Sequence, residues 1–395
     1  EKVLKRFSPW NLVERETIVV RGRPQTYYSI FGISMLDYLD LYQKFIPTKQ
    51  ESYKLDYIGK VELGLQKDEN PYDTFRDWYT KDFQSFIDYN IKDVEIVDGL
   101  EDKLKLIELI LTMAYEAKVN YNDVFSQVRM WDMLIYNFLR KENIVIPPKE
   151  DNVKEDKYDG AYVKDPLTGM HKWVVSFDIN SLYPHLIMQY NISPEKIIGV
   201  KSSGISVAKL LKQQTPLSHL KTEGACITPN GAMFKNDNPG FLPRLLEKMY
   251  NDRVKFKTMA FQAKQEYQKT KDKELTKKIA TYHNIQWAKK ISLNSAYGAI
   301  GNQYFRYYDV RQATAITTSG QFVIRFIENK VNEYMNNILK THDKVDYVVA
   351  SDTDSIYLTL DKLVEATCKD KPIEHILKFI NKVVDSRIQP FLDKC

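Results

Sequence analysis

The stretch that most constrains this chain is "DYVVASDTDSIYLTL", residues 346–360. Two runs rich in Val, Ile, Tyr and Leu flank the tetrapeptide at residues 351–354, and such runs predict two β-strands joined by a tight connection. Strands avoid aspartate, so the carboxylates of Asp352 and Asp354 either belong to a polar turn or have a function of their own. The tetrapeptide alone leaves both interpretations open, and the rest of the chain decides between them.

The length and composition predict a soluble protein of two or three domains, since 395 residues exceed what one hydrophobic core usually holds. No apolar run approaches the ~20 residues of a membrane-spanning helix. The charged start "EKVLKRF" is unlike a signal peptide. Because the first residue is Glu rather than Met, we expect an internal piece of a longer protein or a processed chain.

The three cysteines, Cys226, Cys368 and Cys395, are far apart and form no CxxC pair. This spacing favours a reducing compartment such as the cytoplasm and disfavours a structural zinc site. The six histidines have no HxH or HxxxH spacing, which disfavours zinc-dependent hydrolysis as well.

Positive charge is concentrated in one stretch of the chain. Between Arg244 and Lys290 there are 13 Lys or Arg residues against 5 Asp or Glu, a net charge of +8 in a chain whose total is +5. A basic, helix-like segment on a nearly neutral body favours an anionic partner, most often phosphate. A solvated lysine-rich helix would have the same composition, so charge alone leaves that interpretation open.

Periodicity and turn residues predict an α+β fold with several domains. Residues 17–22 and 26–32 have the composition of strands, whereas residues 33–45 and 83–110 have that of helices. An Asn-Gly pair at residues 230–231 predicts a hairpin turn.

The later part of the chain divides into a strand-and-loop region and a helical region. Prolines and charged residues at 144–160 mark a boundary, and residues 172–179 predict a strand that ends in Asp178. Residues 245–299 predict two antiparallel helices joined by a polar tip, and residues 313–339 predict a further helix.

Asp178 is the first candidate for chemistry outside the hairpin. It ends an apolar strand and is followed by the turn-like "INSLYP", so its carboxylate lies at a strand exit. A turn residue or a helix N-cap would have the same pattern, and Asp178 alone does not separate these interpretations.

Two helical patterns supply groups that suit a nucleotide. Lys290, Asn294 and Tyr297 are spaced i, i+4 and i+7, which places a cation, an amide and an aromatic ring on one helix face. Arg253 and Lys257 are one turn apart on the basic segment, where Arg binds phosphate oxygens in pairs and Lys adds a point charge. Exposed Arg/Lys pairs are common on helices, so the second pattern is weak by itself.

Taken together, these groups predict a phosphoryl-transfer site. Asp178 and Asp354, with Asp352 as a further candidate, would hold two Mg²⁺ ions about 4 Å apart. The cations on the helices would bind a triphosphate from the opposite side. Such chemistry needs charge neutralisation and alignment more than a protein nucleophile, so the missing Ser-His-Asp pattern is no objection.

At these residues the chain resembles family B DNA polymerases. "SFDINSLYPHLI", "KKISLNSAYGAIGN" and "SDTDSIYL" are similar to motifs A, B and C of that family, in the family's order. The segments "YFRYYDVRQATAITTSGQ" and "ISMLDYLDLYQKF" resemble most closely the polymerases of T4-like bacteriophages. The resemblance implies a polymerase palm with an antiparallel sheet, fingers formed by a helical hairpin, and part of an RNase H-like 3′–5′ exonuclease domain.

The resemblance also implies roles for single residues. Metal ligation would fall to the carboxylates of Asp178 and Asp354, with the Ile179 carbonyl assisting and Asp352 in an adjustable role; Mn²⁺ could replace Mg²⁺. Tyr183 matches the steric gate that packs under the sugar and excludes a ribose 2′-hydroxyl. The other nucleotide-binding positions would be Ser181, Leu182, Arg253, Lys257, Lys290, Asn294 and Tyr297. The DNA-contacting positions would be Tyr158, Gly160, Gly298 and Thr353.

The exonuclease resemblance is partial. "YNIKDVEIV" is similar to the third exonuclease motif, with Tyr89 and Asp93 as its functional pair. The two earlier carboxylate motifs are not recognisable before Tyr89, so we expect no competent exonuclease in this chain. His185 stands where the family usually has Ser.

The implied domains are the late exonuclease domain (1–105), a helical segment (106–148), the palm (149–243 and 302–395) and the fingers (244–301), without a thumb. The implied partners of a monomeric polymerase are primer–template DNA and deoxynucleoside triphosphates, with a sliding clamp left open and no membrane. Two alternatives remain: a catalytically silent nucleic-acid-binding fragment, and a nucleotide-sugar glycosyltransferase that uses Asp352-Thr353-Asp354 as a DxD turn.

Overall fold

The structure is a computed structural model that describes residues 2–20, 23–153, 158–201, 204–341 and 345–395. Its internal contacts divide the chain into two units. The first unit comprises Glu1–Asn137 and Arg253–Lys289, and the second comprises Phe138–Asp252 and Lys290–Cys395. The predicted combination of helices with antiparallel strands is confirmed in both units. None of the described helices is long and apolar enough to cross a membrane.

The first unit combines one β-hairpin with helices. Its elements are α1 (Lys2–Lys5), β1 (Val13–Val20), β2 (Arg23–Ile30), α2 (Tyr38–Phe45), α3 (Leu55–Leu63), α4 (Phe75–Lys81), α5 (Phe83–Leu104), α6 (Leu106–Ala117) and the 3₁₀ helix η1 (Tyr121–Phe125). Helix α7 (Gln127–Arg140) begins in this unit, which also holds the second part of α11 (Phe241–Thr270), from Arg253 on, and the first part of α12 (Lys273–Ile300), up to Lys289.

Two element boundaries in the first unit differ from the sequence-based expectation. The helix expected at residues 83–110 is broken at Lys105, which has a left-handed backbone (φ 55°) and separates α5 from α6. The helix expected at residues 33–45 begins only at Tyr38, because the Asp37 side chain accepts a hydrogen bond from the Leu39 N–H and caps it.

The strands expected at residues 17–22 and 26–32 are confirmed for most of their described residues. Strands β1 and β2 pair antiparallel, with Thr17 opposite Thr26. Residues 21–22, the end of the first predicted strand, lie outside the described residues, as does part of the predicted boundary at 144–160.

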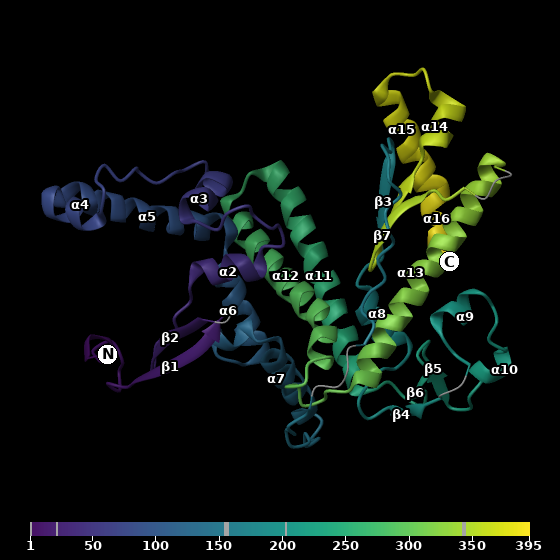
Figure 1. The fold of residues 1–395 in the computed structure, drawn as a ribbon, viewed down its shortest axis with the longest axis horizontal. Helices are drawn as coiled ribbons and strands as arrows, with labels where there is room; N and C mark the ends of the chain where they lie inside the picture. Colours follow the sequence, from purple (N-terminus) through teal and green to yellow (C-terminus); the bar gives the residue numbers. More distant parts are fainter. Residues whose placement is uncertain (1, 21–22, 154–157, 202–203, 342–344) are drawn as a thin grey trace. The chain divides into compact units, whose positions relative to one another are not determined.

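The predicted pair of antiparallel helices is confirmed as α11 and α12, which lie side by side in Figure 1. Lys271, with a φ of 56°, ends the first helix and turns the chain. In the first unit the rings of Phe256 and Tyr282 lie 6.1 Å apart and join the two helices. Lys289 of α12 forms an ion pair of 2.5 Å with Glu116 of α6, so packing and charge together anchor this part of the hairpin.

The second unit holds two small sheets and the long helix α13. Its elements are β3 (Val174–Asp178), α8 (Leu182–Gln189), β4 (Ile197–Val200), α9 (Val207–Leu211), α10 (Leu217–Leu220), β5 (Ala225–Ile227), β6 (Ala232–Lys235), α13 (Val310–Leu339), β7 (Val348–Asp352), β8 (Ser355–Thr359), α14 (Asp361–Cys368), α15 (Ile373–Val383), the π-helical η2 (Val384–Ile388) and α16 (Gln389–Leu392). Helix α13 contacts α8, α9 and strand β7.

The first sheet has the antiparallel order β3–β8–β7 and confirms both strand predictions around the carboxylates. One face of its hairpin is apolar: Val348, Ile356 and Leu358 are buried in a core that also contains Ile324 and Val331 of α13. Since strand side chains alternate between faces, this core fixes which residues of the hairpin point away from it.

The second sheet has the order β4–β6–β5, and its turn confirms the Asn-Gly prediction. The Gly231 N–H donates a hydrogen bond of 2.8 Å to the Thr228 carbonyl, and its φ is 85°. A Cβ at Gly231 would collide with the Lys201 carbonyl oxygen, so the turn requires glycine.

A half-buried ion-pair network fastens residues 158–167 to the first sheet. The ammonium of Lys164 lies 2.5 Å from Glu328 of α13 and 2.6 Å from Asp346, just before β7. Burial lowers the pKa of Lys164, but the hydrogen bonds that its ammonium donates to Asp346 and Glu328 raise that pKa more, so the side chain remains a cation. Its own N–H donates to the Ser351 carbonyl (2.9 Å), which joins the backbone of this segment to β7.

Replacing Lys164 by Met should lower the free energy of unfolding by about 2–3 kcal/mol, because Glu328 and Asp346 would face each other without their cation. Urea denaturation followed by circular dichroism measures this loss. The exposed Lys209→Met is the matched control and should change stability by less than about 0.5 kcal/mol. Equal effects of the two substitutions would contradict the proposed role of the network.

Candidate active site

Asp178 and Asp354 are brought together by the pairing of β3 with β8. Asp178 is the last residue of β3 and lies opposite Ser355, the first residue of β8. The Ile179 N–H donates to the Asp354 carbonyl (2.9 Å) and extends the pairing by one step. The Ser355 hydroxyl donates to the Asp178 carboxylate at 3.2 Å and to that of Asp354 at 3.5 Å, so one side chain bridges both acids.

The turn between β7 and β8 places Asp352 and Asp354 in different surroundings. Thr353 has a left-handed backbone (φ 57°), and its N–H donates to the Tyr162 carbonyl at 3.0 Å. Its hydroxyl donates to the Asp352 carboxylate at 2.8 Å. Asp352 is exposed, whereas Asp354 is half-buried and turned toward Asp178. The structure therefore pairs Asp354 with Asp178 and leaves Asp352 at the rim.

The two paired carboxylates are in electrostatic conflict. Burial raises the pKa of Asp354 above its ordinary value, and the nearby charge of Asp178 raises it further, with a smaller contribution from Asp352. A cation bound between the two carboxylates would offset this repulsion and favour the ionised form of Asp354. Among the residues that the structure describes, no three His, Cys, Asp or Glu side chains are grouped closely enough to hold a metal ion together. Asp178 and Asp354 are therefore a pair, without a third such side chain in ligating position among the described residues.

Three tyrosines form one wall beside the carboxylates. The rings of Tyr183 (α8) and Tyr297 (α12) have centroids 5.0 Å apart, and the Tyr297 hydroxyl donates to that of Tyr158 at 3.3 Å. Burial raises the pKa of Tyr183 to about 12, with the charge of Asp354 as the next cause, and burial also raises the pKa of Tyr297. The hydroxyls of Tyr183 and Tyr297 are therefore neutral at physiological pH.

Other predicted nucleotide-binding residues occupy the same unit. Ser181 has a left-handed backbone (φ 51°) and its carbonyl accepts hydrogen bonds from His185, while Leu182 is buried at the start of α8. On α12, Lys290 is half-buried and Asn294 is exposed.

The predicted DNA-contacting residues also lie in the second unit. The Gly160 carbonyl accepts a hydrogen bond of 2.7 Å from Gln321 of α13, which fixes the backbone beside Tyr158. Gly298 is exposed on α12, one residue after Tyr297. Thr353 forms the turn already described.

Arg253 and Lys257 belong to the first unit, on successive turns of α11. Arg253 is half-buried and Lys257 is exposed. The helical spacing predicted for them is confirmed, whereas a joint action with the carboxylates stays a prediction.

The predicted exonuclease pair has a neighbour that sequence reasoning missed. On α5, the Asp93 carboxylate accepts a hydrogen bond of 2.6 Å from the ammonium of Lys67, which also lies 3.4 Å from the Tyr89 hydroxyl. Burial lowers the pKa of Lys67, but the bond to Asp93 raises it above its ordinary value. Lys67 is a single lysine far from the motif in sequence, so no local pattern points to it.

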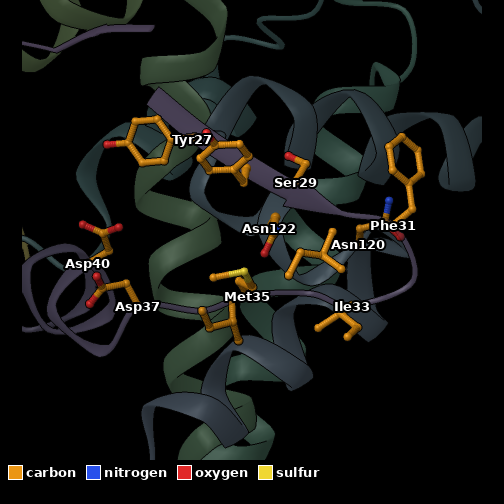
Figure 2. A pocket seen from close by; sticks show the side chains of 12 residues that line it. Tyr27, Ser29, Phe31, Ile33, Met35, Asp37, Asp40, Asn120 and Asn122 are labelled. Atoms are coloured by element: carbon orange, nitrogen blue, oxygen red, sulfur yellow. The ribbon is translucent and has the colours of Figure 1, made fainter. Parts of the chain in front are cut away.

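Two cavities differ in what they could bind. A cavity of about 700 Å³ in the first unit is lined by 12 residues, among them Tyr27, Phe31 and Met35 (Figure 2). Its charged lining residues are Asp37 and Asp40, without Lys or Arg, which disfavours a phosphate ligand. A second cavity, of about 400 Å³, borders Asp178 in the second unit. Its charged lining residues, Asp178 and Asp393, are acidic as well, so the case for phosphate chemistry rests on the paired carboxylates and a cation between them, not on the charge of the cavity.

A sequence model of DNA polymerase family B matches residues 123–386. The chain belongs to DNA polymerase family B. It is 35% identical to the DNA-directed DNA polymerase of Escherichia phage RB69 and 33% identical to that of Enterobacteria phage T4. Both alignments cover 100% of this chain and 48% of the relative, so the family B chain spans about half the length of these relatives.

A solved structure, the family B DNA polymerase from the hyperthermophilic archaeon Pyrobaculum calidifontis, has a similar fold with a TM-score of 0.63. It is 19% identical and covers 97% of this chain and 44% of its own. The predicted resemblance is thus confirmed. Membership in the family favours the polymerase interpretation of Asp352-Thr353-Asp354 over that of a glycosyltransferase.

The raised pKa of Asp354 predicts a pH-dependent stability. Below the ordinary aspartate pKa the carboxyl group is protonated in both folded and unfolded chains, and ionisation penalises the folded chain only as the pH rises through its higher pKa. Asp354→Asn should therefore increase the free energy of unfolding at pH 7 by on the order of 1 kcal/mol. The gain should shrink toward pH 3.5 in urea titrations.

The exposed neighbour supplies the control for this titration. Asp352→Asn retains the oxygen that accepts from Thr353 and should change stability by less than about 0.5 kcal/mol at either pH. A pH-independent effect of Asp354→Asn would contradict the assigned conflict with Asp178.

Proposed function

We propose that this chain carries the nucleotidyl-transfer site of a template-directed DNA polymerase. In this reaction the 3′-hydroxyl of a primer attacks the α-phosphate of a deoxynucleoside triphosphate, and pyrophosphate leaves. The observation that carries the proposal is the meeting of Asp178 and Asp354 at the Ser355 hydroxyl, next to the tyrosine wall. The two phage relatives are DNA-directed DNA polymerases, which supports it.

The donor set fits two divalent cations. Asp178 and Asp354 supply hard carboxylate oxygens from adjacent strands, the Ile179 carbonyl follows directly, and the burial and charge that raise the pKa of Asp354 favour a cation there. Mg²⁺, or Mn²⁺ in its place, would activate the hydroxyl and neutralise the charge of the phosphates. Asp352, at the exposed rim, would adjust this site rather than form its centre.

The remaining residues have assignable roles around the nucleotide. Tyr183 excludes a ribose 2′-hydroxyl, and because its own hydroxyl stays neutral it adds no repulsion to a triphosphate. The backbone of Ser181 and Leu182 contacts the phosphates, and Asn294 and Tyr297 lie beside the nascent base pair. The cations that bind the triphosphate are Arg253, Lys257 and Lys290.

The same proposal assigns the parts of the chain. Residues 149–243 and 302–395 form the palm, residues 244–301 form the fingers, and Tyr158, Gly160, Gly298 and Thr353 contact DNA. Residues 1–105 belong to an exonuclease domain, in which the Lys67 ammonium neutralises Asp93.

Asp354→Asn should reduce Mg²⁺-dependent primer extension by at least about 100-fold, because the substitution removes a charge on which the reaction's electrostatics depend. Extension of a labelled primer on a defined template, with and without Mg²⁺, measures this. Asp370→Asn, an exposed residue of the same unit, is the matched control and should retain full activity. Binding of DNA without extension by the parent chain would favour a silent nucleic-acid-binding protein.

Lys257→Gln should raise the KM for deoxynucleoside triphosphates about tenfold with a smaller change in kcat, because a lost phosphate contact weakens binding by roughly 1.4 kcal/mol. The effect should diminish as salt rises, since salt screens an exposed charge. Lys264→Gln, also exposed on α11 and two turns further along, is the matched control. An equal rise in KM for both variants would show that Lys257 acts only through the overall positive charge of α11, without a specific contact to the triphosphate.

A further inference from the structure

Gly320 is a buried residue in the interior of α13, a helix of 30 residues. An interior glycine weakens a helix relative to alanine because it adds backbone freedom to the unfolded chain and packs no side chain. A glycine at such a position therefore calls for a reason in the surrounding packing.

The reason is the ring of Tyr183. A Cβ at Gly320 would lie 2.8 Å from Cε1 of Tyr183 and 3.6 Å from both Cδ1 of Tyr183 and Cδ2 of Leu182. Ordinary carbon contacts are about 3.5–4.0 Å, so the ring edge would have to move by roughly 1 Å to admit the methyl group. Since α13 and α8 are in contact, the helices themselves bring Gly320 and Tyr183 together.

Little space remains for the ring to move. Its other neighbour is Tyr297, with ring centroids 5.0 Å apart and planes inclined by 53°. Tyr297 is itself held by its hydrogen bond to Tyr158. Leu182 and Pro184, on either side of Tyr183 in α8, are buried, so the backbone that carries the ring is also fixed.

We propose that Gly320 is a positioning residue that sets how far the Tyr183 ring extends into the nucleotide site, and thereby sets the discrimination between deoxyribose and ribose. The inference rests on the proposed polymerase function and deepens it, because it adds a residue on α13 that acts through Tyr183. It requires only that the ring of Tyr183 packs under the sugar and that Gly320 limits its position.

The first test is a kinetic double-mutant cycle with this chain. Gly320→Ala should lower kcat/KM for deoxynucleotides about 10- to 100-fold, the usual effect of a misplacement near 1 Å, and should change the deoxy-to-ribo selectivity ratio at least about fivefold. In a Tyr183→Ala background, where no ring opposes the methyl group, Gly320→Ala should change the ratio less than about twofold. Asn329→Ala, exposed on the same helix, is the matched control for helix propensity.

The second test needs no activity. Gly320→Ala should lower the urea midpoint of unfolding by roughly 0.5 M in the parent chain, yet raise it in the Tyr183→Ala background, where only the gain in helix propensity remains. A selectivity ratio unchanged by Gly320→Ala, or a midpoint shift of the same sign in both backgrounds, overturns the inference. If Asp354→Asn instead leaves extension intact, the proposed function itself fails, whatever the result at Gly320.

Discussion

The repulsion between Asp178 and Asp354 is the constraint around which the second unit is organised. Like charges on neighbouring side chains, one exposed (Asp178) and one half-buried (Asp354), cost free energy unless a cation or another source of stability offsets them. The β3–β8 pairing fixes their separation through consecutive backbone contacts, which include the bond from the Ile179 N–H. The stability comes from the apolar side of the same strands, where Ile356 and Leu358 are buried.

The order β3–β8–β7 explains why a short hairpin can carry this arrangement. Because β8 is the central strand, its first residue, Ser355, pairs with Asp178 at the end of β3 and with Asp352 at the end of β7. The left-handed backbone of Thr353 would be a weak point of such a turn. The Tyr162 carbonyl accepts the Thr353 N–H, and Lys164 fixes the segment that carries this carbonyl. Residues 158–167 thus act as part of the site.

The sequence predicted those features that depend on local pattern. Alternating apolar residues around Asp354, the strand that ends at Asp178 and the helical pair at 245–299 all have signals within a few residues. The break at Lys105 had no such signal, since lysine seldom adopts a left-handed backbone. Motif spacing selected Asp352 and Asp354 together and the family resemblance ranked Asp354 first, while the pairing of β3 with β8 adds a physical reason, a half-buried Asp354 and an exposed Asp352.

A different reason explains why the sequence did not predict Lys67, Lys164 and Gly320. Each of them contacts a residue that is distant in the sequence. Lys67 lies 26 positions before Asp93, and Lys164 lies 164 positions before Glu328. Gly320 meets Tyr183 only because α13 packs on α8. Short motifs name the groups that contact a reactant, whereas the groups that hold them in place are set by tertiary packing. The acids also act on Tyr183, since the charge of Asp354 contributes to the raised pKa that keeps its hydroxyl neutral. Because a neutral ring adds no charge to the carboxylates, a change that moves it alters the shape of the site and leaves the charge of the acids as it was.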